Sequence, residues 1–215
     1  MDQHAFFKDR SDAGKRLGEK LIHFSKERSV VLTILNGGVP LGVEVAKILS
    51  CPLDFVFVHK LYLPHHPEKG FGAVTLGGTL ELNHQVVDQL NLSQKEIEEA
   101  VQIAHTKLKE RKEHLLHDRP SLSLLFKTAI IVDDGLTSGY TMLAAIRAVK
   151  KRSPKKIFVA VPTVSDRGLD LIKNQVDEVT YLYIHPRHFP FEIKKSYVVF
   201  EKLTNEKVDI ILKSV

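Results

Sequence analysis

Two adjacent carboxylates stand between an apolar run and a loop of glycines and hydroxyl side chains in the segment 129–142, AIIVDDGLTSGYTM. The loop from Leu136 to Thr141 offers consecutive backbone N–H groups at the predicted start of a helix, a setting that favours a phosphate dianion. Asp133 and Asp134 could accept hydrogen bonds from two vicinal hydroxyls or approach a hard cation bound there. The pattern therefore predicts a site for a sugar phosphate at the carboxyl end of a strand.

Three other interpretations of the carboxylate pair are weaker. A Walker B strand would need a GxxxxGK[ST] loop to hold a triphosphate, and the chain has none. A dinucleotide site would need GxGxxG, and the nearest match has Thr75 where the last glycine belongs. The two aspartates could also form only a turn and a helix cap. The apolar run, the paired acids, the glycines and the hydroxyls together favour the binding site.

A second candidate loop follows an earlier apolar run and begins at Asn36. Gly37 and Gly38 allow the backbone to approach a ligand closely, and Pro40 suits the first turn of a helix. Lys60 closes the next predicted strand. Its compact ammonium suits a point contact with a phosphate, although a lysine at a strand end is commonly only solvated.

The strands and helices that must position these loops alternate along the chain. Apolar runs of strand length, typical of strands buried on both faces, occur at 30–35, 53–58, 129–132, 156–161 and 178–183. Amphipathic helices are predicted at 9–26, 41–49, 140–151 and 166–174. The alternation favours an α/β fold with a doubly wound, mainly parallel sheet flanked by helices.

The alternation is interrupted by an insertion between residues 61 and 127. Residues 62–82 carry four glycines and two prolines, which predicts a mobile loop leading into a short hairpin. A capping box of Ser93 and Glu96 then opens a long helix, with Leu108 and Lys112 on its apolar stripe. The stretch 185–215, which ends in a predicted helix at 205–212, is expected to cap the main domain as a small C-terminal hood.

The composition is that of an ordinary globular protein. Of the 215 residues, 43% are hydrophobic and 27% are charged, which excludes collagenous, disordered and disulfide-rich classes. No apolar run approaches the roughly 18 residues of a membrane span, and residues 1–10 are too polar for a signal peptide. A cytoplasmic protein without a membrane partner is therefore expected. Cys51 is the only cysteine, and no ligand spacing among the eleven histidines supports a zinc site.

The net charge of +5 is concentrated in the stretch 147–156, which reads RAVKKRSPKK. Such a stretch could bind nucleic acid. It could equally be the last turn of a helix and its exit loop, where the helix dipole favours cations. The second interpretation is the stronger one, so nucleic acid is not an expected partner.

The run VDDGLTSGYT resembles the phosphoribosyl diphosphate (PRPP) signature of the type I phosphoribosyltransferases. The segments FKDRSDAGKRL, GGVPLGVEVA and KLYLPHHPEKGFGAV resemble a predicted bacterial branch of that family, and the similarity weakens after about Pro186. The resemblance implies one phosphoribosyltransferase-like domain over residues 1–215. It implies that Asp133 and Asp134 hold the ribose hydroxyls, and that the 5-phosphate is bound by Gly135, Leu136, Thr137, Ser138, Gly139, Tyr140 and Thr141.

The same resemblance assigns the diphosphate to residues near the ends of the first two strands: Asn36, Gly37, Gly38 and Lys60. Relatives usually carry an arginine at the position of Asn36, so one positive charge is missing here. The glycine-rich loop would close over the reacting centre and exclude water, with His65 or His66 assisting proton transfer. Residues 185–191 would take part in selecting the acceptor.

The implied reaction transfers the phosphoribosyl group of PRPP to a nitrogenous acceptor and releases diphosphate. Asp133, Asp134 and Lys60 would be its catalytic residues, acting through positioning and charge stabilisation. Mg²⁺ would arrive with the diphosphate and the sugar, because it keeps oxygen ligands and waters. The acceptor is not indicated, and a homodimer is left open. A second hypothesis is a regulator of the same fold that senses PRPP or a nucleotide and binds nucleic acid through residues 147–156.

Overall fold

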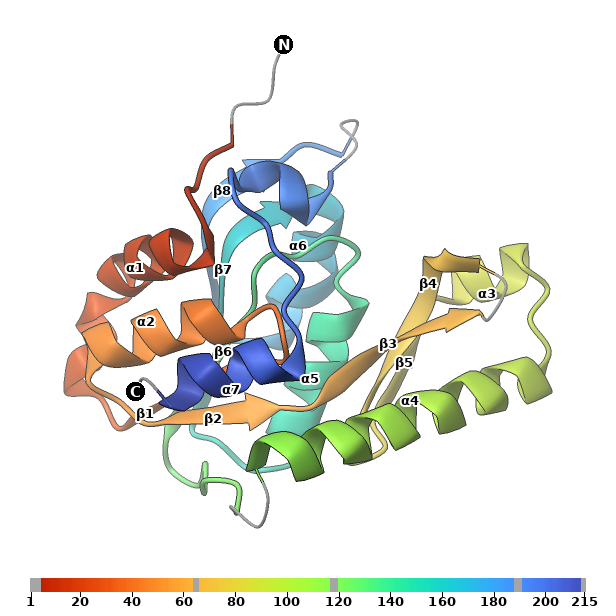
Figure 1. Ribbon diagram of the computed structural model, residues 1–215, viewed down its shortest axis with the longest axis horizontal. Coiled ribbons are helices and arrows are strands. Elements are labelled where there is room, and N and C mark those ends of the chain that lie inside the picture. Colours follow the sequence, from red (N-terminus) through yellow and green to blue (C-terminus); the bar gives the residue numbers. More distant parts are fainter. Residues whose placement is uncertain (1–4, 64–65, 117–119, 188–190, 214–215) are drawn as a thin grey trace.

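The central sheet has five parallel strands in the computed structural model, which describes residues 5–63, 66–116, 120–187 and 191–213 (Figure 1). From one edge to the other, the strands are β2 (Leu53–Val56), β1 (Ser29–Ile34), β6 (Thr128–Val132), β7 (Lys156–Ser165) and β8 (Glu178–His185). Every neighbouring pair is parallel. The strand order reverses between β1 and β6, and doubly wound sheets bind ligands at such a switch point. The predicted α/β architecture is confirmed.

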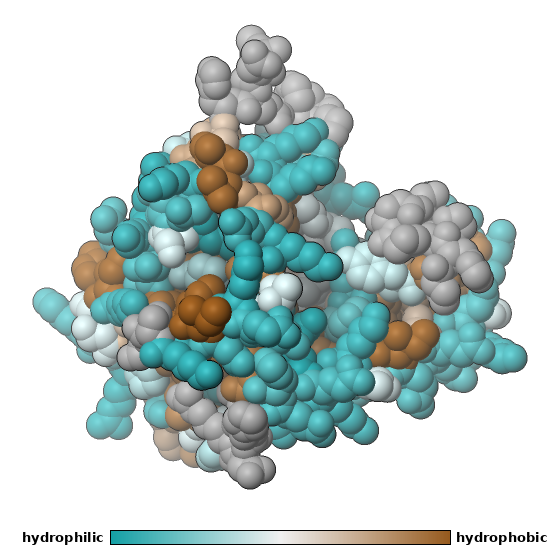
Figure 2. Space-filling model, in the orientation of Figure 1, coloured by the Kyte–Doolittle hydropathy of each residue, from teal (hydrophilic) through white to brown (hydrophobic). Residues whose placement is uncertain are grey.

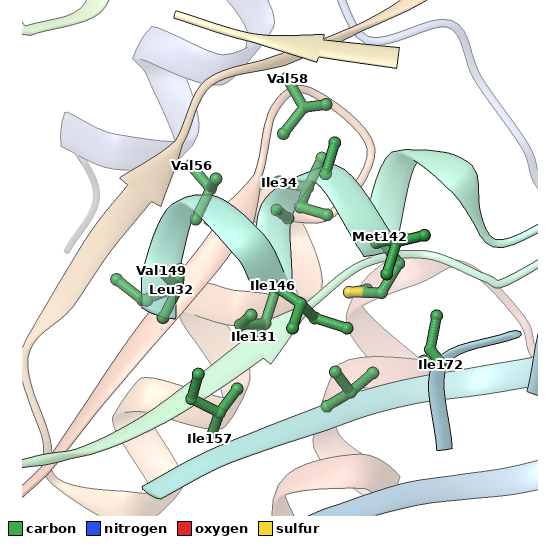
Figure 3. Close-up of a cluster of buried hydrophobic side chains, with 14 of the residues drawn as sticks. Leu32, Ile34, Val56, Val58, Ile131, Met142, Ile146, Val149, Ile157 and Ile172 are labelled. Carbon is green, nitrogen blue, oxygen red and sulfur yellow. The ribbon is translucent and has the colours of Figure 1, made fainter. Parts of the chain in front are cut away.

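Helices cover both faces of this sheet, and alternate strand residues face different helices. The helices are α1 (Arg10–Lys20), α2 (Val39–Leu49), α5 (Tyr140–Lys150) and α6 (Asp166–Ile172). Val30, Leu32 and Ile34 pack with α5 and α6 (Figure 3), whereas Val31 packs with α1 and α2 on the opposite face. Because their two faces are buried, β1, β6 and β7 read as apolar runs in the sequence, whereas the edge strand β8 is only partly buried.

A second sheet, antiparallel and ordered β3-β4-β5, extends from the central one beside a long helix (Figure 1). The elements of this region are β3 (Val58–Leu63), β4 (His66–Thr75), β5 (Leu80–Leu82), α3 (His84–Gln89) and α4 (Gln94–Leu116). The run 53–58 is therefore not one strand, since β2 ends in the first sheet and β3 begins in the second. The buried side chains continue without a break through Phe57, so the hydrophobic pattern does not show where the chain passes from the first sheet to the second.

In the described residues between 61 and 74, the loop predicted ahead of the hairpin is instead formed by the paired strands β3 and β4. The glycines of this segment serve close packing. A side chain at Gly70 would collide with the side chain of Lys60, and one at Gly72 would collide with the backbone of the neighbouring strand β5. Glycine predicts freedom in a loop, whereas here it permits contact between the backbone and its neighbours.

The helix α4 packs on β3 and β4 through an apolar stripe. Its capping box is confirmed: the backbone N–H of Ser93 donates to the Glu96 carboxylate at 2.8 Å, and the N–H of Glu96 donates to Ser93 Oγ at 3.3 Å. The end of the stripe differs from the prediction. Arg111 is partly buried and Lys112 is exposed, because Arg111 lies three residues from the fully buried Leu108 and shares its face.

The C-terminal segment contains the short 3-10 helix η3 (Ile193–Ser196) and the helix α7 (Asn205–Lys213). The helix predicted at 205–212 is thereby confirmed. α7 lies against α2 and α4. One polar contact across this interface joins His114 of α4 and Asp209 of α7 at 2.9 Å. Two further 3-10 helices are η1 (Ile22–Lys26) and η2 (Lys173–Gln175), which divide the predicted helices 9–26 and 166–174 near their ends.

The basic stretch 147–156 is largely occupied by contacts within the chain. Its bonded cations are Arg147 with Glu81 (2.6 Å), Lys150 with Gln175 (3.4 Å), Lys151 with Thr79 (2.9 Å) and Arg152 with Asp54 (2.9 Å). Figure 2 shows one face of the molecule, which is mostly hydrophilic with apolar side chains in separate patches. Within the part of the chain that the structure describes, no helix combines the length and apolar character needed to cross a membrane.

Leu108 and Ile103 offer a matched test of how α4 is held. Leu108 is fully buried, whereas Ile103 is 48% exposed on the same helix. Leu108→Ala is expected to lower the free energy of unfolding by about 2 to 5 kcal/mol, because the substitution leaves a cavity. Ile103→Ala is expected to change it by about 0.5 kcal/mol. Urea denaturation measures both values, and equal losses would contradict this packing.

Candidate functional site

Two loops meet at the switch point between β1 and β6. The loop after β1 carries Asn36, Gly37 and Gly38, and the loop after β6 begins with Asp133 and Asp134. The loops are packed so closely that a side chain at Gly37 would collide with the Asp134 carboxylate. The two candidate ligand-binding loops of the sequence are therefore neighbours in space, and the contact between them requires glycine.

Two adjoining cavities open at this junction. The larger, of about 380 Å³, is lined by residues of both loops, of β3, of α4 and of the C-terminal segment, including Asn36, Lys60, Arg111, Asp133, Thr141 and Leu203. The smaller, of about 140 Å³, follows the loop after β6 and shares Lys60, Asp133 and Thr141 with the larger one. The structure thus places Lys60 and the acidic loop, which are far apart in the sequence, around adjoining spaces.

The hydroxyl-rich loop after β6 is fixed in place by the end of β7. The N–H of Leu136 donates to the carbonyl of Thr163, and the N–H of Ser165 donates to the carbonyl of Leu136, both at 2.9 Å. The hydroxyl of Ser165 also donates to the carbonyl of Thr137 at 2.6 Å. Gly139 then starts α5 with φ of 88°, a left-handed conformation that favours glycine. The first turn of α5 presents its free N–H groups on a preformed loop, as an anion site requires.

Asp133 is the carboxylate of the pair that remains available to a ligand. It is partly buried and lines both cavities. Its Oδ1 accepts the backbone N–H of Asp134 at 2.9 Å, and no cation among the described residues is bonded to it. Burial raises the pKa of Asp133 well above its usual range, and the nearby Asp134 carboxylate raises it further. A hydroxyl or a cation could therefore take the remaining oxygen.

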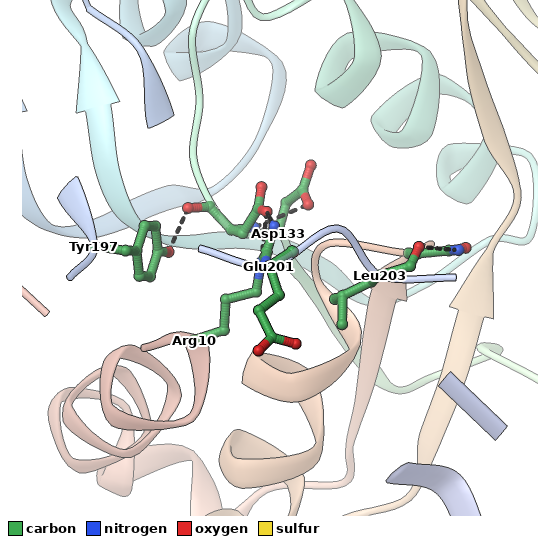
Figure 4. Close-up of polar contacts among 7 residues, drawn as sticks. Arg10, Asp133, Tyr197, Glu201 and Leu203 are labelled. Carbon is green, nitrogen blue, oxygen red and sulfur yellow. Dashed lines mark hydrogen bonds and ion pairs between the residues drawn. The ribbon is translucent and has the colours of Figure 1, made fainter. Parts of the chain in front are cut away.

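Asp134, by contrast, is buried in an internal ion pair with Arg10 of α1 (Figure 4). The Nε and Nη2 atoms of Arg10 lie 2.9 and 2.8 Å from Oδ2 of Asp134. Burial raises the pKa of Asp134, and the guanidinium opposes that rise. Arg10 also donates to the Glu201 carbonyl at 2.8 Å and lies 3.8 Å from the centre of the Phe200 ring. The hydroxyl of Tyr197 donates to the backbone carbonyl of Asp134 at 2.6 Å.

Arg10 and Tyr197 were missed by the sequence reasoning. A signal for Arg10 was present, because it lies three residues before Ala13 and seven before Leu17 on the buried stripe of α1. A charged residue on an apolar stripe implies a buried partner. Tyr197 has no such local signal, since its partner is 63 residues away in the sequence.

Asn36 uses its amide donors within the protein. Its Nδ2 donates to the carbonyl of Leu203 at 2.9 Å and to Oδ1 of Asn205 at 3.2 Å. The peptide bond between Leu35 and Asn36 is cis. The side chain predicted to donate to a diphosphate therefore holds the C-terminal segment against the loop. Lys60 has no ion pair among the described residues, and burial lowers the pKa of its ammonium.

The remaining predicted site residues are two histidines of the segment 62–82 and the segment predicted to select the acceptor. His65 lies outside the described residues, and His66 begins β4. In the segment predicted to select the acceptor, His185 stacks on Phe191 with ring centres 4.1 Å apart. Ile193, which follows this segment, lines the smaller cavity beside the loop after β6. The C-terminal segment therefore contributes to both cavities.

The donor set suits a hard cation that brings most of its own ligands. Asp133 offers a carboxylate oxygen, whereas Asp134 is held by Arg10. Among the residues that the structure describes, no three His, Cys, Asp or Glu side chains group as a metal site. Mg²⁺ prefers oxygen ligands and retains waters, so these residues fit an ion held largely by a bound phosphate compound.

Residues 9–182 match the family model of the phosphoribosyl transferase domain. The chain belongs to the phosphoribosyl transferase family. Two curated relatives from Mycobacterium tuberculosis, named "Putative phosphoribosyl transferase MT0597" (strain CDC 1551 / Oshkosh) and "Putative phosphoribosyl transferase Rv0571c" (strain ATCC 25618 / H37Rv), are each 34% identical over 202 residues. The alignments cover 94% of this chain and 45% of each relative, so the chain spans about half the length of these curated relatives.

Solved structures are similar to this chain over most of its length. The crystal structure of TT1426 from Thermus thermophilus is 33% identical with a TM-score of 0.76, covering 97% of this chain and 98% of that one. The AQ2163 protein from Aquifex aeolicus shares the fold, with 14% identity and a TM-score of 0.50 over 81% of this chain and 74% of that one. The family match ends at residue 182, whereas Tyr197, Glu201 and Leu203 contact the site from beyond it.

Arg10 allows a stability test of the buried ion pair. Arg10→Met is expected to lower the free energy of unfolding by about 3 to 5 kcal/mol, because it leaves the Asp134 carboxylate buried and unpaired. The double variant Arg10→Met/Asp134→Asn should recover part of that loss. Lys173→Met is the control: it removes a surface pair with Asp170 in which the lysine is 51% exposed, and should cost about 1 kcal/mol or less. Chemical denaturation measures all three, and a similar cost for Arg10→Met and Lys173→Met would refute the role of the pair.

Proposed function

We propose that this chain is a phosphoribosyltransferase that binds PRPP together with Mg²⁺, transfers its phosphoribosyl group to a nitrogenous acceptor and releases diphosphate. The observation that carries the proposal is the junction of the β1 and β6 loops, which sets Asp133, Lys60 and a phosphate-type loop around adjoining cavities. Membership of the phosphoribosyl transferase family supports the same reaction.

The two cavities suggest how the substrate lies. The 5-phosphate takes the smaller cavity, against the loop from Leu136 to Thr141 at the start of α5. The diphosphate takes the larger cavity, beside Gly37 and Lys60. The ribose then bridges them next to Asp133, because this residue belongs to both walls. This arrangement exposes the anomeric carbon between the phosphate subsites.

In the reaction, the acceptor nitrogen forms a bond to the anomeric carbon while the bond from that carbon to the diphosphate oxygen breaks. Lys60 stabilises the negative charge that develops on the leaving diphosphate. Asp133 accepts a hydrogen bond from a ribose hydroxyl and holds the sugar in place, and Arg10 keeps Asp134 oriented beside it. Bound Mg²⁺, held by substrate oxygens and Asp133, would neutralise diphosphate charge. The acceptor nitrogen gives up its proton to a general base or to water as the new bond forms.

Asp133→Asn tests the site apart from the fold. It should weaken PRPP binding by about 1 to 3 kcal/mol, because a charge-assisted hydrogen bond is lost. A carboxyl with a raised pKa costs stability at neutral pH, so the variant should unfold at an equal or higher temperature at pH 7. The difference in unfolding temperature between Asp133→Asn and wild type should shrink as the pH falls toward the ordinary aspartate pKa, because the carboxyl of the unfolded wild type is then also protonated. Calorimetry and thermal unfolding measure the two effects.

Asp170→Asn is the matched control, because Asp170 is a surface carboxylate with 39% of its side chain exposed. It should leave PRPP affinity unchanged. Equal PRPP affinity in wild type and Asp133→Asn would remove Asp133 from the site.

A screen for PRPP-dependent diphosphate release, with purine and pyrimidine bases and with amines, tests the activity itself. We expect one class of acceptor to support diphosphate release from PRPP. We expect Asp133→Asn to lose this release. Salt-dependent binding of RNA or DNA with no release would favour the regulator instead. The internal bonds of residues 147–156 make that second function the weaker one. A cytoplasmic location, a homodimer and a single domain stay predictions.

A further inference from the structure

Arg111 of α4 carries a guanidinium group that has no hydrogen-bond or ion-pair partner among the described residues. Its Nε is buried and unpaired. The buried Arg10 and the partly buried Arg152 differ from it, since they bond to Asp134 and Asp54. Removing a cation from water without a counter-charge is costly. The missing partner of Arg111 is therefore an anion that the described chain does not supply.

The position of Arg111 shows where that anion would lie. The side chain lines the larger cavity together with Asn36, Gly37 and Lys60. It is held there from both sides along α4: Leu108 is fully buried three residues earlier, and His114 bonds to α7 three residues later at 2.9 Å. Arg111 is consequently presented to the cavity by an anchored helix.

The charges around the cavity are divided between its walls. His59, Lys60 and Arg111 come from β3 and α4, and burial lowers the pKa of each. The carboxylates Asp133 and Asp134 come from the loop after β6, and the second is neutralised by Arg10. A ligand that fills this space must direct negative charge toward the wall formed by β3 and α4.

We propose that Arg111 binds the diphosphate group of PRPP and of the released product. The proposal rests on the proposed function. The planar fork of a guanidinium matches two phosphate oxygens at once. Asn36 supplies no charge to this group, and its amide donors bond to Leu203 and Asn205. Arg111 provides from across the cavity the positive charge that the loop after β1 lacks.

Isothermal titration of wild type, Arg111→Gln, Arg111→Lys and Lys112→Gln tests the proposal, with diphosphate, PRPP plus Mg²⁺, and ribose 5-phosphate as ligands. Arg111→Gln should bind diphosphate and PRPP about ten- to a hundredfold more weakly, the range for losing hydrogen bonds to a charged group. Its affinity for ribose 5-phosphate should stay within about twofold, because this ligand lacks the diphosphate. Arg111→Lys should fall between, since it keeps the charge and loses the fork. Lys112→Gln removes an exposed charge from the next position and should bind all three ligands normally.

Thermal unfolding provides the control for folding. Arg111→Gln removes an unpaired cation, so its unfolding temperature should equal or exceed that of wild type, and diphosphate should raise it less. If Arg111→Gln does not fold, wild-type affinity for diphosphate in Arg111→Lys overturns the inference, and a reduced affinity supports it. The inference is overturned if Arg111→Gln binds diphosphate as tightly as wild type. It is also overturned if Lys112→Gln loses as much diphosphate affinity as Arg111→Gln, or if Arg111→Gln loses as much affinity for ribose 5-phosphate as for diphosphate.

The outcomes for wild type separate this inference from the proposed function. Wild type that binds diphosphate through Arg111 but does not bind PRPP contradicts the phosphoribosyltransferase and supports the anion site. Equal PRPP affinity in wild type and Arg111→Gln supports the function and overturns the inference. Wild type that binds neither ligand overturns both.

Discussion

The burial of the Asp134 carboxylate constrains the whole arrangement of the site. A buried charge must be paired, and Arg10 pairs it from a position 124 residues away in the sequence. Arg10 in turn needs an acceptor for its remaining N–H groups, which the Glu201 carbonyl supplies. The same carboxylate leaves no room for a side chain at position 37, where the chain has glycine. One ion pair thus fixes α1, the two loops at the switch point and the C-terminal segment relative to one another.

The polar side chains around the cavities divide into those that the protein satisfies and those that it leaves open. The protein itself bonds the Asp134 carboxylate, the Arg10 guanidinium and the Nδ2 donors of Asn36. Asp133 and Lys60 line the cavities with capacity to spare. The bonded side chains make the walls of the cavities rigid. These rigid walls hold Asp133 and Lys60 partly buried in the absence of a ligand. Within these two cavities, the polar groups that the protein leaves unpaired therefore mark where a charged substrate would be held.

Much of the fold could be predicted from the sequence because the strands of a covered parallel sheet are apolar on both faces. The loop after β6 was also visible, since its acids, glycines and hydroxyls are contiguous in the chain. The pair of Asp134 with Arg10 and the contact of Asn36 with Leu203 could not be predicted in the same way, because the partners are far apart in sequence. The start of β3 was hidden by a continuous run of buried residues, and Gly70 suggested a loop where it only gives room to a lysine.

The contacts made by residues 197–205 give the site an order of assembly. These residues leave the ribosome after all five strands of the central sheet, which end at His185. A nascent chain can therefore pair its strands while Arg10 still lacks the Glu201 carbonyl and Asn36 lacks the Leu203 carbonyl. During that interval the acidic loop is framed by only part of its wall. The wall of the pocket thus depends on the last of these residues to emerge, since Glu201 and Leu203 carry the carbonyls that Arg10 and Asn36 bond.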